Sequence, residues 1–128
     1  MKNKGYLLDT SVLIWAMEKN PRLKPELISL LENPEVLVFV SVASIWEIVV
    51  KREKTPLKVP KNIVKSIKNV NFQILPIESD HVMEIERLSS YHNDPFDRML
   101  ISQARAEKLT LISSDKKIGK YKVKLLKV

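Results

Sequence analysis

Four acidic residues lie at points in the chain where a carboxylate could take part in chemistry. Asp9 ends the apolar run "YLLD", Asp115 follows "LTLISS", Asp97 stands in "HNDPFDRML", and Glu47 lies within "SIWEIVV". All four offer hard oxygen atoms, which are the ligands that Mg²⁺ and Mn²⁺ prefer. One or two such ions can activate water and stabilise the leaving oxygen of a phosphodiester. If the four acids converge, the sequence predicts a metal site for phosphodiester hydrolysis.

The surroundings of two of these acids favour that interpretation. Glu47 has apolar residues on both sides, and a helix that is apolar nearly all round is usually buried. A buried carboxylate is costly unless a metal cation, a lysine or an arginine pairs with it. Pro95 suits the first helical position, so Asp94 is the predicted N-cap and Asp97 the third helical residue, beside Arg98. The positive end of the helix dipole and the neighbouring charge of Arg98 would both keep Asp97 ionised, as a metal ligand must be.

Each acid also has an ordinary structural explanation. Thr10 or Ser11 is a possible N-cap of the first helix, but Asp9 could also cap a helix that starts at Thr10. Asp115 could belong to a surface turn with the preceding serines. Glu47 follows Ser44 by three residues, which is the spacing of a capping box. Asp94 is assigned a structural role alone.

The histidines and tryptophans are given structural roles as well. His81 and His92 have no serine or cysteine nearby in a nucleophile context, so they are interpreted as structural or surface residues. Trp15 and Trp46 lie on apolar helical faces, and core packing explains them better than base stacking.

The amino-acid composition limits which cofactors and partners the chain could bind. The 128 residues include no Cys, 2 His and 2 Gly, which excludes disulfides and Gly-rich phosphate loops and makes zinc a poor candidate. The formal net charge of +7 favours a polyanionic partner. Basic residues concentrate in 51–68 and 116–127, and Lys51, Arg52 and Lys116 are candidates for sequence-independent phosphate contacts. The absence of cysteine suits a cytoplasmic protein, and no stretch approaches the ~20 apolar residues of a membrane span.

Short apolar strands alternate with helices along the chain. Strands are predicted at 6–9, 36–40, 72–77, 109–113 and, at an edge, 122–128; helices are predicted at 10–19, 25–33, 41–54, 61–69, 79–91 and 95–108. This pattern is typical of a three-layer α/β/α sandwich around a central parallel sheet, here as a single domain over residues 1–128. Ligands of such sheets bind beyond the carboxyl ends of the strands, where Asp9 and Asp115 would lie.

The segments "YLLDTSVLIW", "SVASIWEIVVK", "HNDPFDRMLISQA" and "LTLISSD" resemble the PIN-domain ribonucleases, specifically the VapC-type toxins of toxin–antitoxin pairs. The resemblance covers residues 6–126 and implies a PIN-like α/β/α fold and metal-dependent endonucleolytic cleavage of RNA. It implies that Asp9, Glu47, Asp97 and Asp115 form the catalytic metal site for Mg²⁺ or Mn²⁺. Asp9 and Asp97 would be the firmest ligands.

The same resemblance implies supporting residues and partners. Thr10 and Ser113 would support the acids through hydroxyl hydrogen bonds, and the partners would be a small antitoxin and a second copy of the chain. Many members of this subgroup carry His where Ser11 stands and a Gly-Lys pair near Lys54-Thr55, so the pocket rim and the following loop differ here.

Two other functions compete with the ribonuclease hypothesis. A phosphotransfer enzyme would need a second acid two residues after Asp9, where Ser11 stands, or paired acids at the end of the first strand. A non-catalytic module could bind RNA or protein through its basic surface, but pure binding does not require converging carboxylates.

Overall fold

Five parallel strands form the single sheet at the centre of the molecule, in the order β3-β2-β1-β4-β5. The computed structural model describes residues 5–128. The strands are β1 (Tyr6–Leu8), β2 (Val38–Ser41), β3 (Gln73–Leu75), β4 (Thr110–Ser113) and β5 (Leu125–Lys127). The α-helices are α1 (Thr10–Glu18), α2 (Pro25–Glu32), α3 (Val42–Arg52), α4 (Ile63–Asn69), α5 (Ser79–Glu84) and α6 (Pro95–Glu107); the 3₁₀ helices are η1 (Ile85–Arg87) and η2 (Ile118–Lys120).

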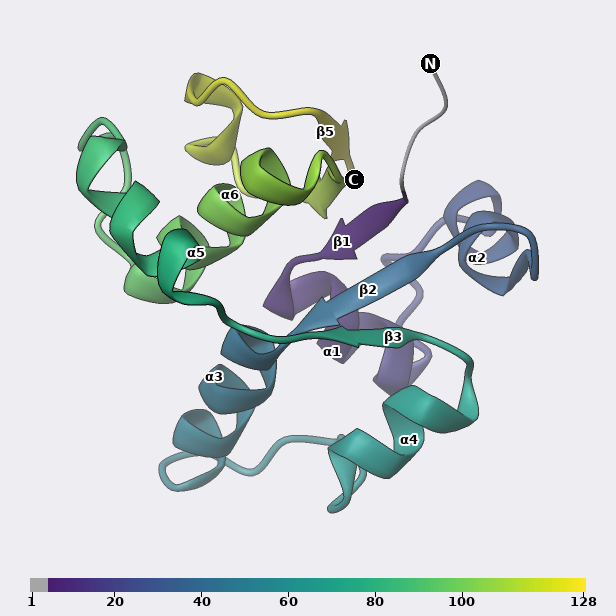
Figure 1. Ribbon diagram of the computed structural model, residues 1–128. Coiled ribbons are helices and arrows are strands. Elements are labelled where there is room, and N and C mark those ends of the chain that lie inside the picture. The colour runs from purple at the N-terminus through teal and green to yellow at the C-terminus, as the bar shows by residue number, and fades with distance from the viewer. Residues whose placement is uncertain (1–4) are drawn as a thin grey trace.

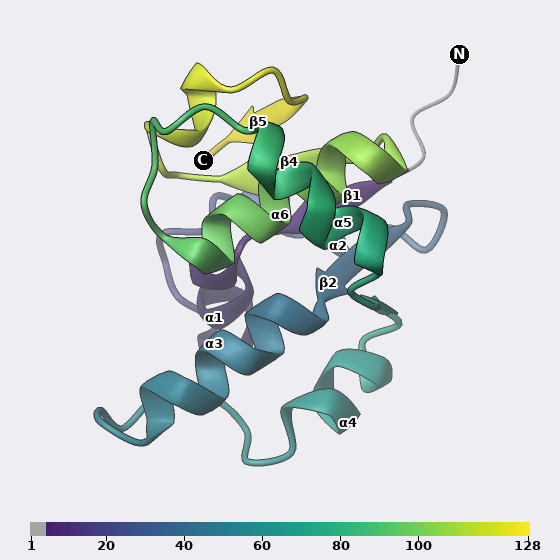
Figure 2. The ribbon, with the colours of Figure 1, turned by 60° about the vertical axis from the view of Figure 1, so that its left-hand side comes forward.

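Helices cover both faces of the sheet, as Figures 1 and 2 show. Neighbouring residues of β1 point to opposite sides: Leu8 packs with α1, α2 and α4, and Leu7 packs with α6 and η2. Both leucines are fully buried, because the central strand is covered on both sides. The prediction of a three-layer α/β/α sandwich around a parallel sheet is confirmed.

Helix α3 connects the two cores at the carboxyl edge of the sheet. Its Ala43 belongs to the core on the α6 side, and its Ile48 belongs to the core on the α1 side. Because parallel strands all end at the same edge, the residues that follow β1, β2 and β4 lie there together with α3 and the first turn of α6.

Several local predictions need correction. The helix predicted over 79–91 is a six-residue α-helix followed by the 3₁₀ turn η1, so residues 88–91 form a loop. Asp9 caps α1, rather than Thr10 or Ser11. The amphipathic pattern of residues 61–69 predicts that Val64 shares an apolar face with Ile63 and Ile67. The two isoleucines are buried, but Val64 is exposed. Trp46 is not a core residue, since 58% of its surface is exposed.

Among the helices of residues 5–128, none has the length and apolar character needed to cross a membrane. The single domain over 1–128 stays a prediction, and the first four residues of that span lie outside the described part of the chain.

Candidate metal centre

The carboxylate of Asp9 both caps a helix and faces the carboxyl edge of the sheet. Its backbone N–H donates to Ile112 O (3.0 Å), which fixes the residue between β1 and β4. Oδ1 accepts from Val12 N (2.8 Å), as an N-cap does, and Oδ2 accepts from Ser113 Oγ (2.5 Å). Only 4% of Asp9 is exposed. The structural explanation is therefore correct for one oxygen, and the other oxygen points to the end of β4.

Asp115 is tied to the same strand end. Its N–H donates to Ser113 Oγ (3.0 Å), and its Oδ1 accepts from Lys117 N (2.8 Å), so the predicted surface turn exists. The remaining oxygen, Oδ2, lies 2.8 Å from His92 Nε2. The hydroxyl of Ser113 thus joins Asp9 and Asp115 in one hydrogen-bonded group.

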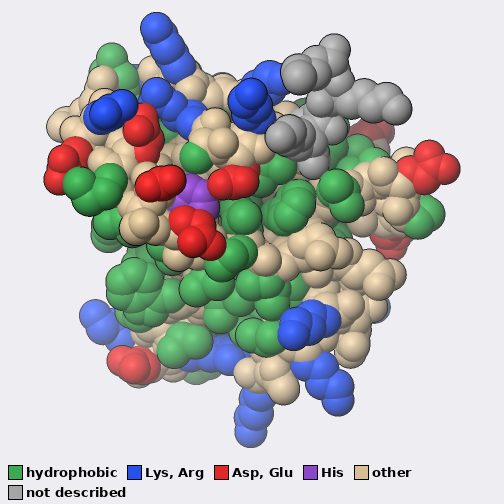
Figure 3. Space-filling model, viewed as in Figure 1, with side chains coloured by type: hydrophobic (Ala, Val, Ile, Leu, Met, Phe, Trp, Pro, Cys, Tyr) green, Lys and Arg blue, Asp and Glu red, His purple; other side chains and the backbone are tan. Residues whose placement is uncertain are grey.

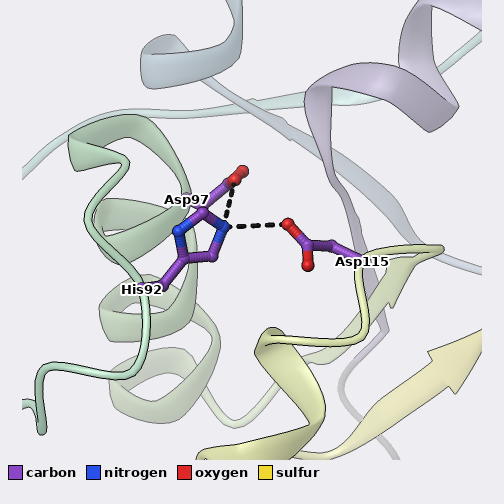
Figure 4. Close-up of side chains that lie close together, drawn as sticks. All are labelled: His92, Asp97 and Asp115. Atoms are coloured by element: carbon purple, nitrogen blue, oxygen red, sulfur yellow. Dashed lines mark hydrogen bonds and ion pairs between the residues drawn. The ribbon is translucent and has the colours of Figure 1, made fainter.

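Asp97 enters this group from the first turn of α6. As predicted, Asp94 is the N-cap, and its Oδ1 accepts from Phe96 N (2.8 Å) and Asp97 N (3.1 Å). The Asp97 Oδ2 atom lies 2.9 Å from His92 Nε2. One imidazole nitrogen therefore contacts both Asp97 and Asp115, as Figure 4 shows.

His92 is the site residue that the sequence interpretation missed. It was assigned to structure or surface because no nucleophile stands near it in the chain. Its sequence position, two residues before the N-cap of α6, was the available signal. Asp115, its other partner, is 23 positions away.

Glu47 is buried in α3 with one oxygen paired and one unpaired. Oε2 forms an ion pair with Lys51 Nζ (3.1 Å), which is the lysine partner that a buried carboxylate requires. Oε1 is buried and has no hydrogen-bond partner among the described residues. The predicted capping box with Ser44 is wrong, because Ser41 caps α3 and Glu47 lies in mid-helix.

The four acids are close enough to perturb one another. Burial and the charge of Asp94 raise the pKa of Asp97, His92 opposes them, and the charges of Glu47 and Asp9 add to the rise, so that the pKa reaches about 7. Burial also raises the pKa of Asp9, and the charges of Asp115 and Glu47 add to that effect although hydrogen bonds from Ser113 and Val12 oppose it. Asp9, Glu47 and Asp97 therefore lie within one electrostatic neighbourhood.

Asp115 behaves differently because it is more exposed and well hydrogen-bonded. Burial alone would raise the pKa of its carboxyl, but the Lys117 N–H, the His92 hydrogen bond and the charges of both residues lower it below its usual value. Asp115 is thus ready to carry negative charge at the open side of the cluster.

This donor set fits a hard divalent cation. Burial, and after it the charges of neighbouring carboxylates, raise the pKa of Asp9 and of Asp97, and a bound cation would oppose both effects. Oε1 of Glu47 is a buried hydrogen-bond acceptor, and no described residue donates to it. Figure 3 shows acidic side chains gathered around a histidine, with a hydrophobic area beside them.

An open groove of about 440 Å³ adjoins the acids. Glu47, Lys51, Lys54 and Phe96 are among its lining residues. The ring of Phe96 meets the exposed ring of Trp46 edge to face, with centroids 4.9 Å apart. The groove therefore combines positive charge with apolar surface next to the carboxylates.

The other predicted residues have partners of their own. Thr10 Oγ1 donates to Ser44 Oγ (3.0 Å), which links α1 to α3 beneath Asp9. Arg52 donates to the carbonyls of Pro60 and Lys61. Phosphate contacts by Arg52, Lys51 and Lys116 stay predictions.

Comparison with known proteins identifies the family. The PIN domain family model matches residues 6–124. The chain belongs to the PIN domain family. No curated protein matches the sequence.

Solved structures share this PIN fold over nearly the whole chain. They include DNA-bound VapBC from Salmonella typhimurium (TM-score 0.71, 14% identity, covering 96% of this chain and 97% of that one). VapBC2 from Rickettsia felis, bound to a promoter DNA fragment, has a TM-score of 0.69 at 17% identity, covering 95% and 97%. VapBC-5 from Mycobacterium tuberculosis, of a toxin–antitoxin family, has a TM-score of 0.60 at 19% identity, covering 97% and 98%. The PIN-like fold inferred from the sequence motifs is confirmed.

Proposed function

We propose that this PIN domain is a Mg²⁺- or Mn²⁺-dependent endoribonuclease and the toxin of a toxin–antitoxin pair. The observation that carries the proposal is the unpaired, buried Oε1 of Glu47 beside acids whose pKa values are raised by burial and by one another. A group of carboxylates with this excess of negative charge is suited to a divalent cation. The net charge of +7 suits a polyanionic substrate.

Asp9, Asp97, Glu47 and Asp115 would hold the ion. When bound, a divalent ion supplies a water of lowered pKa and stabilises charge on phosphate oxygens. The protein orients the ligands: Ser113 Oγ holds Oδ2 of Asp9, the N-cap of α6 fixes Asp97, and Lys51 holds one oxygen of Glu47. The lysines of the adjoining groove would contact flanking phosphates without reading sequence.

Cleavage of end-labelled single-stranded RNA by the purified chain tests this proposal. Asp97→Asn keeps the shape of the side chain and removes its charge, and Asp80→Asn on exposed α5 is the matched control. We expect cleavage by the wild type and the control with Mg²⁺ or Mn²⁺, none with EDTA, and none by Asp97→Asn. An active Asp97→Asn protein, or metal-independent cleavage, would contradict the assignment. A parallel DNA oligonucleotide tests the choice of RNA.

We also propose protein partners. The neighbouring structures named above are VapBC complexes, which favours an antitoxin here. Val42, Trp46 and Val49 form an exposed apolar stripe along α3 next to the site, and such a stripe suits a protein contact by an antitoxin or by a second copy. Light scattering measures the molecular mass of the wild type and of Trp46→Glu in solution, and so shows whether each is a homodimer. A wild-type monomer at all concentrations would exclude the dimer, and the antitoxin contact would then be the remaining proposal for this stripe.

A further inference from the structure

We propose that His92 is a positioning residue for the metal centre: its Nε2, hydrogen-bonded to Asp115 and in contact with Asp97, holds both acids in the orientation of metal ligands, and Arg98 and Tyr121 hold the loop that carries it. This inference rests on the proposed metal site. It assigns His92 a role as hydrogen-bond donor rather than metal ligand.

The hydrogen bonds of the imidazole ring decide between these two roles. Asp94 N–H donates to His92 Nδ1 (3.2 Å), so Nδ1 has a lone pair and no proton. In the neutral ring the proton then lies on Nε2, which hydrogen-bonds to Oδ2 of Asp115 (2.8 Å) and lies 2.9 Å from Oδ2 of Asp97. A nitrogen that carries a proton has no lone pair for a cation. Although His92, Asp97 and Asp115 have the spacing of a metal-binding trio, His92 serves the two acids and not the ion.

The backbone of His92 is held as firmly as its ring. Its N–H donates to Tyr121 Oη (2.9 Å), and its carbonyl accepts from Arg98 Nη1 (3.2 Å). Tyr121 Oη in turn donates to Ser89 O (2.7 Å). The loop that follows η1 is therefore held against Arg98 of α6 and against Tyr121, the residue that follows η2.

Arg98 holds the loop through the several N–H donors of its planar guanidinium group. Besides His92 O, its guanidinium donates to the carbonyls of Ser89 (2.9 Å), Ile85 (3.2 Å) and Leu88 (3.4 Å). The position beside Asp97 suggested a charge partner for that acid, but the described hydrogen bonds of Arg98 go to carbonyls and to Tyr121. A lysine has a single ammonium group and cannot reach such a spread of acceptors.

Removing the imidazole would leave the two acids without the group that lies between them and contacts both. The ligand-capable atoms of the trio lie within 4.8 Å of one another, a separation at which carboxylates repel. The side chain of Asp115 would then turn toward solvent, and an incoming ion would have to order it again. Groups that orient metal ligands in this way typically contribute about 10–100-fold in metal affinity.

Calorimetric titration of the metal-stripped protein with Mg²⁺, Mn²⁺ and Co²⁺, without RNA, tests the inference. We expect His92→Ala to weaken binding of all three ions by a similar factor of about 10–100. His92→Gln, whose amide N–H can reach the position of Nε2, should recover most of that affinity. His81→Gln is the matched control, since it alters the other buried histidine, and it should bind the ions as the wild type does. Thermal unfolding in EDTA checks that each variant folds.

Three outcomes would overturn the inference. Unchanged ion affinity in His92→Ala would show that the imidazole orients nothing. A loss much larger for Co²⁺ than for Mg²⁺ would make His92 a nitrogen ligand, because imidazole suits Co²⁺ better. No recovery in His92→Gln would mean that the donor is not what matters. If His92→Ala does not fold, Arg98→Lys carries the test, with weaker ion binding expected and wild-type binding contradicting the clamp.

Failure of the proposed function gives a different pattern. A wild-type protein that binds the ions but leaves RNA intact would end the ribonuclease proposal and leave the role of His92 standing. A wild-type protein that cleaves RNA, with a His92→Ala variant of equal ion affinity, would end only the inference about His92.

Discussion

Helix α6 carries a polar cluster near each end, and each cluster contains a buried histidine. Near the N-terminal end, His92 lies against Asp97 and Asp115. Near the C-terminal end, His81 lies against Glu107, with its Nε2 2.8 Å from Oε2. The two histidines are 9% and 2% exposed. The clusters differ in how completely their polar atoms are partnered.

The His81 cluster is partnered throughout. His81 Nδ1 accepts from Glu78 N (3.0 Å), in a capping box that starts α5. Gln103 accepts from Ser41 Oγ (2.5 Å) and donates to Pro76 O (3.1 Å), which links β2, α6 and the segment after β3. The carboxylate that faces His81, on Glu107, is 44% exposed at the side chain. Such a network fixes how elements pack and offers nothing to a ligand.

The acidic cluster has the opposite balance. Several carboxylates share one histidine and one serine hydroxyl, and an oxygen of Glu47 has no hydrogen-bond partner within residues 5–128. The pKa of Asp97 is raised to about 7. Buried carboxylates without enough partners destabilise the metal-free protein. Such groups cluster at functional sites, so this cluster points to a function. The comparison teaches that burial of a histidine beside an acid is uninformative until the remaining polar atoms have been traced.

Among substitutions in the two clusters, Asp9→Asn in the acidic cluster should have the largest effect, which is loss of RNA cleavage. The variant removes one ligand charge and relieves repulsion, so RNA cleavage should fall by on the order of 10³-fold, about 4 kcal/mol in the barrier, whereas the metal-free fold should keep its stability or gain some. Gel-based cleavage rates and urea denaturation in EDTA measure the two quantities. Equal activity in Asp9→Asn and the wild type would remove the acids from the mechanism.

Gln103→Ala should produce the next largest effect, on stability alone. It leaves the hydroxyl proton of Ser41 without its acceptor and the Pro76 carbonyl without its donor, so the free energy of unfolding should drop by about 2–3 kcal/mol. Urea denaturation measures the loss, and calorimetry should give wild-type Mn²⁺ affinity. A variant with full stability but weakened ion binding would reverse the roles of the two clusters.

The pH dependence of stability should differ with and without metal. Between about pH 4 and the pKa of about 7, folded Asp97 binds a proton that the unfolded chain has lost, so metal-free stability should fall as pH rises. Asp9 acts in the same direction, and the lowered pKa of Asp115 has its opposite effect only in acid. A divalent ion should therefore raise the unfolding temperature by several degrees more at about pH 8 than at about pH 5. Calorimetric melts check this; equal shifts at both pH values would contradict it.

Glu107→Gln should have the smallest effect. The amide can still hydrogen-bond His81, and the half-exposed charge is screened by solvent, so the loss of unfolding free energy should stay below about 1 kcal/mol. Chemical denaturation measures it. A loss comparable to that of Gln103→Ala would show that the charge, rather than the hydrogen-bond network, stabilises this end of α6.

The site was predicted best where one local rule was enough. The pair Asp94-Pro95 predicts the start of α6, and with it the position of Asp97 in the first turn. The apolar run before Asp9 predicts that this acid follows a strand. Trp46 was placed in the core because its face of α3 is apolar, yet that face is exposed beside the groove. Periodicity shows that a helix has an apolar face, but it does not show what covers that face.

The sequence alone determined the alternation of strands and helices, the parallel sheet, and the strand-end and helix-start positions of Asp9, Asp97 and Asp115, because these depend on neighbours a few residues apart. Only the tertiary structure decided that His92 joins two of the acids, that Arg98 serves carbonyls, and that one oxygen of Glu47 stays unpaired. Those outcomes depend on which side chains packing brings within hydrogen-bond reach across tens of residues, and no local propensity specifies that distance.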